Sequence, residues 1–440
     1  MSTPYGIART NVLWLTAKDS YQGKADISAT ANTLSADAHL LPTPEYLHEK
    51  RAFGIWSLPK DTTTADQKAI AVERRLAQYI DFYREAIEQN KWYGLWNYGD
   101  MMHAYDPERH SWRYDVGGFA WDNTELATPM WLWYNFLRTG RSDIWTMAEA
   151  MTRHCSEVDT YHIGPFAPLG SRHNVTHWGC GAKEARISQS AFDRFYYYLT
   201  TDERTGDLMA EQTDADTLLY HLDPMRLAEP RSKYPCNAPA RLRIGPDWLA
   251  YAGNWMTEWE RFGTKKYQDK IVKGLESIAA LEDGIFTGNL AKGYDPATGR
   301  ITYDGDPSIK FTNHLMTIMG GFEIMNELMP MFEGRCPKFN ETWLDFARRY
   351  KQMAATTRKS YFPVRRLEAY AAWHDRDASR MKTVWDALWG QADNDLQLAD
   401  KSDLVLPPEV PAPISELPGV STNNAALWSL DAIYILEALP

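Results

Sequence analysis

The chain has 440 residues, of which 44% are hydrophobic and 24% charged, so it can bury a large core and disorder is not expected. Its formal net charge is −11, from 47 basic and 58 acidic residues, which argues against nucleic acid as a partner because phosphate binding needs a basic surface. Aromatic residues make up 13%, including 18 Trp and 24 Tyr. Such rings suit a sugar-binding cleft or a large helical core, and composition alone does not separate the two.

Targeting and cofactor signals are absent from the sequence pattern. Residues 1–16 lack the charged and apolar regions of a signal peptide, and no apolar run is long enough to span a membrane, so we expect a cytoplasmic protein without membrane contact. We expect no cofactor, and no motif indicates Ca²⁺. No C-x-x-C pair occurs, which predicts reduced thiols rather than zinc or redox chemistry at Cys155, Cys180, Cys236 and Cys336.

In chain order, residues 1–65 are predicted to form an irregular extension with one strand-like run at Asn11–Thr16, and residues 66–440 a helical domain. Apolar residues at helical spacing predict a helix over Asp66–Asn90, with Asp66 as the N-cap. The same periodicity predicts eleven further helices over residues 122–139, 142–158, 184–199, 206–222, 246–262, 265–282, 311–330, 341–357, 363–375, 377–391 and 422–437.

A weak internal repeat indicates how these helices are arranged. An aromatic helix, a glycine-containing stop and a second amphipathic helix recur roughly every 60 residues. Twelve helices in six such hairpins predict an all-α fold, an (α/α)6 toroid; an irregular bundle or solenoid is the alternative. The three repeats with their turns are Trp131–Arg153 with Thr139-Gly140, Phe192–Tyr220 with Thr205-Gly206, and Trp248–Leu275 with Gly263-Thr264.

Polar chemistry is concentrated in the connections between helices, where binding groups are expected. The first such segment, residues 92–103, combines four aromatic residues, two glycines, an amide, a carboxylate and a histidine. The second, Trp121–Glu125, precedes an apolar helix. There Asp122 or Asn123 could be an N-cap with Glu125 as its capping-box partner, or the segment could bind a ligand.

The third segment, residues 171–179, contains Arg172, His173, Asn174 and His177. With Lys183 and Arg186 it forms a local basic island in an acidic protein, as an anionic substrate requires. Two histidines four residues apart could bind a metal on one helix face, but the flanking glycine favours a loop, so no metal site is predicted. His154, Asp159 and His162 lie just upstream, where a helix ends and leads into this segment.

In their order along the chain these motifs resemble the rhamnogalacturonan exolyase family, polysaccharide lyase family 26 and its uncharacterised relatives. The resemblance is closest over residues 92–200. It implies the C-terminal α/α-toroid portion of the family, in which β-rich domains precede the toroid, so that residues 1–65 would be a remnant of such a domain. The residues that carry it are Trp96–Asp100, Trp121–Glu125, Thr139–Arg141, Arg153-His154, Val158-Asp159 and Arg172–Trp178.

The resemblance implies a polysaccharide lyase that acts on the ends of a rhamnogalacturonan I type backbone in pectin. Such β-elimination removes the C5 proton of a uronate and expels the oxygen at C4, so it needs a charge neutraliser, a base and an acid. We expect Arg172 with Asn174 as neutralisers, His173 or His177 as base, and Tyr98 or Tyr105 as acid. The expected substrate-binding residues are Trp96, Asn97, Asp100, His103, Trp121, Asp122, Asn123, Glu125, His162, Trp178 and Lys183.

Two alternatives stay open on the sequence alone. A glycoside hydrolase on the same ring, acting on a uronate-containing or unsaturated oligosaccharide, would use two carboxylates from among Asp100, Asp115, Asp122 and Glu125. A non-catalytic glycan-binding or truncated domain would need only the aromatic residues and the basic island. In all three cases the expected partner is an acidic oligosaccharide or polysaccharide.

Overall fold

Twelve of the helices in the described residues form a closed ring of six hairpins, which confirms the all-α toroid. The computed structural model describes residues 3–35, 39–61, 63–227, 231–357, 364–392 and 420–439. The inner helices are α4 (Thr128–Thr139), α6 (Ser190–Thr200), α8 (Leu249–Phe262), α10 (Gly321–Phe332), α12 (Arg365–Asp375) and α14 (Thr422–Ala438). The outer helices are α3 (Gln67–Asn90), α5 (Ser142–Glu157), α7 (Glu203–Gln212), α9 (Lys265–Ala279), α11 (Pro337–Thr357) and α13 (Ala378–Ala392).

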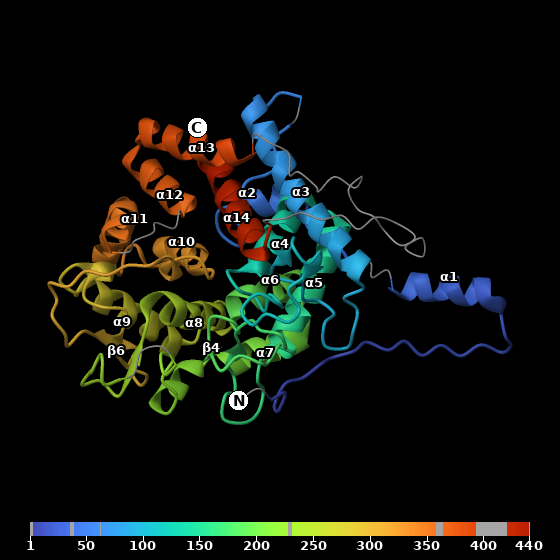
Figure 1. Cartoon of the computed structure of the whole chain (residues 1–440), viewed down its shortest axis with the longest axis horizontal. Helices are drawn as coiled ribbons and strands as arrows, with labels where there is room; N and C mark the ends of the chain where they lie inside the picture. The colour runs from blue at the N-terminus through green and yellow to red at the C-terminus, as the bar shows by residue number, and fades with distance from the viewer. Residues whose placement is uncertain are drawn as a thin grey trace.

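The ring closes because the last inner helix packs against the first. Helix α14 contacts α4 on one side and α12 on the other, while α4, α6, α8 and α10 contact one another in sequence. Figure 1 shows the colours following the ring from α3 through α9 to α14. Since each hairpin reverses the chain once, successive inner helices run in the same direction and their N-termini meet at one end of the ring.

Short strands lie in the connections that lead to the inner helices. Strands β1 (Tyr105–Asp106) and β2 (Ser111–Trp112) form an antiparallel pair ahead of α4, and β3 (Gly170–Ser171) pairs with β4 (Lys183–Glu184) ahead of α6. A three-stranded antiparallel sheet has the order β5-β6-β7. Its strands are β5 (Ala240–Leu242), β6 (Lys292–Asp295) and β7 (Arg300–Thr302). These strands hold the loops at the end of the ring where the inner helices begin.

The N-terminal extension contains two helices, α1 (Gly23–Ser35) and α2 (Pro44–Glu49). Helix α2 packs on α4, whereas α1 has no buried residue in its described part and lies apart from the ring in Figure 1. The predicted strand at Asn11–Thr16 is wrong, since this run belongs to no strand and its Leu13 and Leu15 side chains are exposed. Alternating polarity gives a strand only where a partner strand supplies hydrogen bonds. A domain boundary at residue 65 stays a prediction.

The helix ends follow the predicted signals in most places. Asp66 caps α3 by accepting a hydrogen bond from the Ala69 backbone, and glycines in the left-handed conformation follow α4 and α8 at Gly140 (φ 64°) and Gly263 (φ 67°). The predicted turn at Thr205-Gly206 is wrong, because Thr201 ends α6 with φ 57° and Gly206 lies within α7. The predicted start of a helix at residue 363 lies outside the described residues.

The predicted starts of α6 at residue 184 and of α10 at residue 311 are wrong, since these helices begin at Ser190 and Gly321. The deviation that matters most for the site is at the start of α4, which begins at Thr128 rather than at residue 122. Asn123, Thr124, Leu126 and Ala127 all have positive φ, between 46° and 67°, so the chain makes a tight left-handed turn before the helix. The N-cap position is Ala127, without a side-chain hydrogen bond, so the predicted capping box with Glu125 is not formed. Asp122 to Glu125 are therefore free of a helical role.

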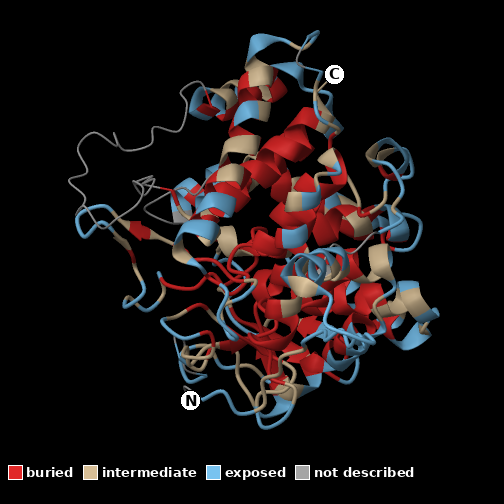
Figure 2. Cartoon of the chain, turned by 90° about the vertical axis from the view of Figure 1, so that its right-hand side faces the viewer, coloured by how far each residue is buried: buried red, intermediate tan, exposed pale blue. Residues whose placement is uncertain are grey.

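The core fills the ring with aromatic side chains, among them Trp131, Trp133, Trp248, Trp255 and Trp343, none more than 1% exposed. Figure 2 shows buried residues through the interior of the ring and exposed residues along its loops and outer helices. Among the described residues, no helix combines the length and the apolar character that crossing a membrane requires. Many of the aromatic residues are thus buried in the core, and only the exposed ones can contact a ligand.

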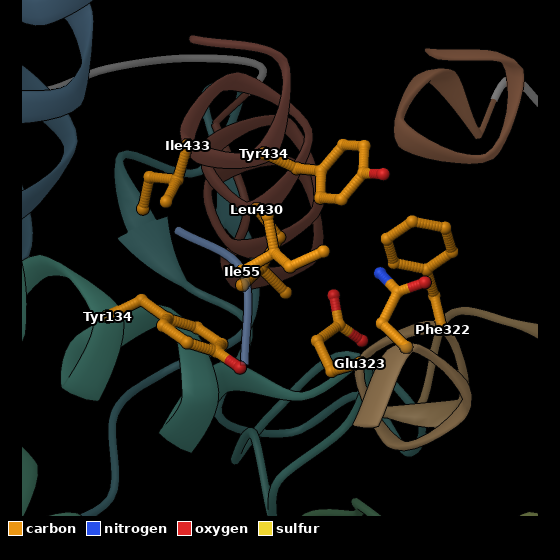
Figure 3. Close-up of a pocket in the computed structure, with 8 residues that line it drawn as sticks. Ile55, Tyr134, Phe322, Glu323, Leu430, Ile433 and Tyr434 are labelled. Atoms are coloured by element: carbon orange, nitrogen blue, oxygen red, sulfur yellow. The ribbon is translucent and has the colours of Figure 1, made fainter. Parts of the chain in front are cut away.

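Figure 3 shows a cavity inside the ring, bordered by Tyr134 of α4, by Phe322 and Glu323 of α10, and by Leu430 and Tyr434 of α14. Its volume of about 10 Å³ is room for roughly one water molecule, so no sugar binds there. The nearby polar groups serve the structure instead.

An ion-pair network beside this cavity ties three inner helices together. The buried Arg366 of α12 pairs with Glu323 of α10 (Nε to Oε1, 2.9 Å) and with Asp431 of α14 (Nη1 to Oδ1, 2.7 Å). The Asp431 carboxylate also accepts hydrogen bonds from the Arg365 and Arg366 backbone, which caps the start of α12. The network therefore holds α10, α12 and α14 together, where the C-terminal end of the chain completes the ring.

The variant Asp431→Ala is expected to lower the free energy of unfolding by about 3–5 kcal/mol, because it leaves the Arg366 guanidinium buried with one partner fewer. The exposed pair of Lys265 with Asp269 supplies the control, since Asp269→Ala should cost less than about 1 kcal/mol. Urea unfolding followed by circular dichroism measures both. Equal losses in the two variants would contradict a structural role for the network.

Candidate active site

The loops that precede α4, α6 and α8 meet where the inner helices begin, and an ion-pair chain joins them. Arg186 pairs with Glu125 (Nη1 to Oε1, 3.1 Å) and with Glu184. Arg243 in turn pairs with Glu184 (3.3 Å) and with Asp247 (2.7 Å). Although burial alone would raise it, Arg186 and Arg243 lower the pKa of Glu184 to about 2. These alternating ion pairs hold the three loops in fixed positions relative to one another.

Because of this network, only part of the predicted basic island is available to a ligand. Arg186 is nearly fully buried between two carboxylates, so it has little charge left for a ligand. The Arg172 side chain is 43% exposed and its Nε lies 3.6 Å from Glu125 Oε2. Lys183 is buried, with its Nζ donating to Ser171 Oγ (3.0 Å) and to the Trp178 carbonyl (2.8 Å), and burial lowers its pKa to about 8. Arg172 is thus the member of the predicted island that can reach a bound anion.

Two histidines stand beside Arg172 and form what we call the histidine pair, His103 and His173. Their ring centroids are 5.2 Å apart, and His173 Nε2 lies 3.8 Å from Glu125 Oε2. His103 Nδ1 is 2.7 Å from Thr422 Oγ1 at the start of α14. Burial lowers the pKa of His103 to about 4 and also lowers the pKa of His173. Both rings are therefore neutral near pH 7.

Asp100, His154, Asp159 and His177 form a second group, which we call the buried cluster. His177 Nδ1 lies 3.1 Å from Asp100 Oδ2, and His154 Nε2 lies 3.2 Å from Asp159 Oδ1. Three of the four side chains are fully buried and the fourth, that of His177, is 3% exposed. Burial lowers the pKa of His154 to about 4, while burial and the neighbouring Asp100 raise the pKa of Asp159.

Asn123 connects the buried cluster to the turn before α4. Its side-chain Nδ2 donates to Asp159 Oδ1 (2.7 Å), to the His177 carbonyl (2.6 Å) and to the Ser171 carbonyl (3.2 Å). Its φ of 46° is a left-handed conformation that asparagine tolerates better than most residues. Next to it, burial and Asp100 raise the pKa of the Asp122 carboxyl, which is 0% exposed. The positive-φ turn thus places the Asn123 amide within hydrogen-bond distance of the buried cluster.

The aromatic residues of the first motif divide between surface and core. Trp96 is 39% exposed and meets Trp178 edge to face, with ring centroids 5.7 Å apart. Trp121 is buried, and its ring lies 4.8 Å from that of His177. Tyr98 is 37% exposed, whereas Tyr105 is buried. Tyr93 of the same motif is also exposed, at 45%. Trp96, Trp178 and Tyr98 are therefore among the predicted residues whose rings can touch a ligand.

Three other predicted residues are placed as follows. Asn97 Oδ1 lies 3.3 Å from His177 Nε2, at the edge of the buried cluster. The Asn174 side-chain oxygen accepts a hydrogen bond from the Val175 backbone, which leaves its NH₂ group to donate. His162 lies apart, with its Nδ1 2.8 Å from Glu211 and its Nε2 3.1 Å from the Glu157 carbonyl.

Sequence reasoning missed Arg243 and Asp247 and gave little weight to His154 and Asp159. Arg243 and Asp247 lie just before α8, as Arg186 lies just before α6, so the hairpin repeat is the signal that could have found them. His154 lies in the last turn of α5, and Asp159 follows five residues later, just after the helix. A histidine at a helix C-terminus is common for reasons of the helix dipole, which hid its role.

Comparison with known proteins identifies the class to which this fold and site belong. The chain matches the family described as the PcRGLX-like protein C-terminal alpha/alpha toroid domain over residues 37–440, and it belongs to that family. This confirms the resemblance seen in the sequence and the α/α-toroid fold.

Similar proteins were found both by sequence and by structure. An uncharacterized protein of Bacillus subtilis strain 168, YetA, is 39% identical over 448 residues, which is 100% of this chain and 51% of that protein. The chain therefore spans about half the length of this relative. A crystal structure of an unsaturated glucuronyl hydrolase specific for heparin is similar over 82% of this chain and 97% of that one, at 11% identity and a TM-score of 0.42.

The variant Asn123→Ala is expected to lower the free energy of unfolding by about 3 kcal/mol or more, because three buried acceptors lose their donor. Asn90→Ala is the matched control. Its amide donates one hydrogen bond, to the Ala86 carbonyl, and its loss should cost about 1 kcal/mol. Chemical denaturation compares the two, and an Asn123→Ala protein as stable as the control would remove Asn123 from the framework of the site.

Proposed function

We propose that the domain binds a uronic-acid glycan where its inner helices begin and cleaves it by β-elimination, with an end of a rhamnogalacturonan I type chain as its substrate. The single observation that carries this proposal is the half-exposed Arg172 beside the neutral, buried ring of His173. The family match supports glycan processing, and the lyase chemistry rests on the site residues.

Arg172 and Asn174 would hold the uronate carboxylate. The guanidinium offers a fixed pair of N–H donors that fits two carboxylate oxygens, and Asn174 has an NH₂ group to add. The positive ends of the inner helices point at the same region and favour negative charge. Removal of the C5 proton moves charge onto the carboxylate, so donors already in place lower the barrier.

His173 is the base that the geometry favours over His177. A base must be neutral to accept a proton, and burial keeps the His173 ring neutral near pH 7. His177 is engaged with Asp100 and Asn97, and Trp121 covers its ring. As the C5 proton moves to His173, the C4–O bond breaks and a C4=C5 double bond forms.

The departing oxygen takes a proton from a tyrosine hydroxyl. Of the two predicted acids, Tyr98 is 37% exposed and Tyr105 only 9%, so Tyr98 is the more accessible. Trp96, two residues before Tyr98 in the chain, meets Trp178 edge to face, and both offer ring faces on which a sugar can stack.

The carboxylates at this site favour a lyase over a hydrolase. Glu125 is held ionised, since Arg186, His173 and Arg172 lower its pKa although burial opposes them. Asp122 has a raised pKa but is 0% exposed, so it has no access to a glycosidic oxygen. A hydrolase needs both an acid and a base on opposite sides of the bond.

Ultraviolet absorbance during incubation with rhamnogalacturonan I, and separately with polygalacturonate, tests the proposal. A rising signal from the C4=C5 double bond is expected with the first substrate. Because the chain spans about half of its relative, calorimetric binding of the same oligosaccharides is measured in parallel. New reducing ends without the double bond would establish the hydrolase, and binding without cleavage would leave a glycan-binding domain.

His173→Ala is expected to lower kcat about 10²–10⁴-fold, the usual contribution of a general base. Arg172→Ala should raise KM, because the carboxylate is held in the ground state, and lower kcat, because charge that builds on the carboxylate strengthens this contact in the transition state. Arg109→Ala is the control, since this arginine is 42% exposed, like Arg172, but pairs with Asp106 and Asp115. An unchanged rate in His173→Ala would sink the base assignment.

The pH dependence of kcat/KM provides a separate check. Because burial lowers the pKa of His173 below its ordinary value of 6.5, the neutral base persists into weakly acidic solution. As His173 takes up a proton the rate should fall, and the midpoint of this fall should lie below pH 6.5. A decline already complete at pH 6.5 would contradict a buried histidine base.

A further inference from the structure

The buried cluster has the dimensions of a tetrahedral metal site. Asp100, His154, Asp159 and His177 each offer one ligand atom, and all four atoms lie within 4.8 Å of one another. Ligands about 2.1 Å from a tetrahedral zinc ion stand about 3.4 Å apart. Four of the six separations are 3.1, 3.2, 3.6 and 3.8 Å, each between a histidine nitrogen and a carboxylate oxygen.

The outward hydrogen bonds of the histidines leave lone pairs facing the cluster. His154 Nδ1 lies 3.2 Å from the Tyr98 carbonyl, which has no proton to give, so this nitrogen carries the N–H. Its Nε2 then points an unprotonated lone pair at Asp159 and Asp100. His177 repeats the arrangement, with Nε2 against Asn97 Oδ1 and Nδ1 against Asp100. Metal-binding histidines are oriented by outer partners in this way.

The charges of the buried cluster also require a proton or a cation at its centre. Lone pairs of imidazole nitrogens and carboxylate oxygens repel one another at these distances unless a proton or a cation lies between them. The two carboxylates are fully buried, where uncompensated charge is very costly. The nearest lysine, Lys183, is engaged with Ser171 Oγ and the Trp178 carbonyl instead.

We propose that Asp100, His154, Asp159 and His177 bind one divalent transition-metal ion, and that Zn²⁺ is the ion that fits. Two imidazole nitrogens and two carboxylate oxygens in a tetrahedron suit zinc. Calcium takes six to eight oxygen ligands, and magnesium requires an octahedron of oxygens, so neither fits this set.

The ion would act as a structural cross-link. Four protein ligands fill its coordination shell, which leaves no open position for substrate. Asp100 comes from the loop before α4, His154 and Asp159 from the end of α5, and His177 from the loop before α6. The ion therefore fixes the loop that carries Arg172 and His173, four residues before His177.

Metal analysis of the full chain, purified without a histidine tag, tests this inference. One zinc per chain is expected, with at least a tenfold lower content in His154→Gln and Asp159→Asn. The control His48→Gln should keep its metal, because His48 pairs with a carboxylate too, Glu437 at 3.0 Å, but belongs to no cluster of ligands among the described residues.

A second measurement uses the wild-type chain alone, in case the variants fail to fold. After removal of metal with a chelator, Zn²⁺ should restore a higher melting temperature, Ca²⁺ and Mg²⁺ should not, and Co²⁺ should give the intense visible bands of tetrahedral cobalt. No bound metal and no response to Zn²⁺ would overturn the inference. None of these readouts depends on glycan cleavage.

Discussion

The common direction of the six inner helices is the constraint on which the rest of the structure depends. Because every hairpin reverses the chain, every inner helix begins at the same end of the ring. The loops that precede α4, α6 and α8 must therefore share that end, together with the positive ends of the helix dipoles. The ion-pair chain from Glu125 through Arg186, Glu184 and Arg243 to Asp247 is a consequence of this convergence. The topology therefore brings the polar loops and the helix N-termini to one end of the ring before any single residue is considered.

The turn before α4 shows how local backbone geometry serves that site. Four residues with positive φ are unfavourable for an ordinary chain, and such strain persists where the surroundings determine it. Here the surroundings are the three acceptors of the Asn123 amide, which join the turn to Asp159 and to the loop of His177. A regular helix from residue 122 would have directed Asn123 elsewhere. The cost of the turn is offset by the hydrogen bonds that it allows.

The ring was predictable because its signal is periodic and repeated. Apolar spacing located all twelve helices, and glycine marked the ends of α4 and α8 correctly. The end of α6 was not predictable in this way, because Thr201 takes the left-handed conformation without being glycine or asparagine. The start of α4 failed for a related reason, since Asp122 and Glu125 satisfy the pattern of a capping box while the chain uses them otherwise. Local patterns give elements, but contacts far apart in sequence decide where those elements end.

The sequence predicted which residue types form the candidate site, but it did not predict which of them lie together. His173 and His177, four residues apart, lie in two different groups because the loop that carries them is not a helix, and neither spacing nor composition reveals this. The difference matters for function. His173 shares its surroundings with Arg172, which solvent reaches, whereas His177 shares its own with three buried ligand atoms. Near this site Arg186 is neutralised by two carboxylates, whereas the Arg172 side chain is 43% exposed. If the proposed function holds, selectivity for an acidic sugar depends on this one exposed charge, and the net charge of −11 says little about it.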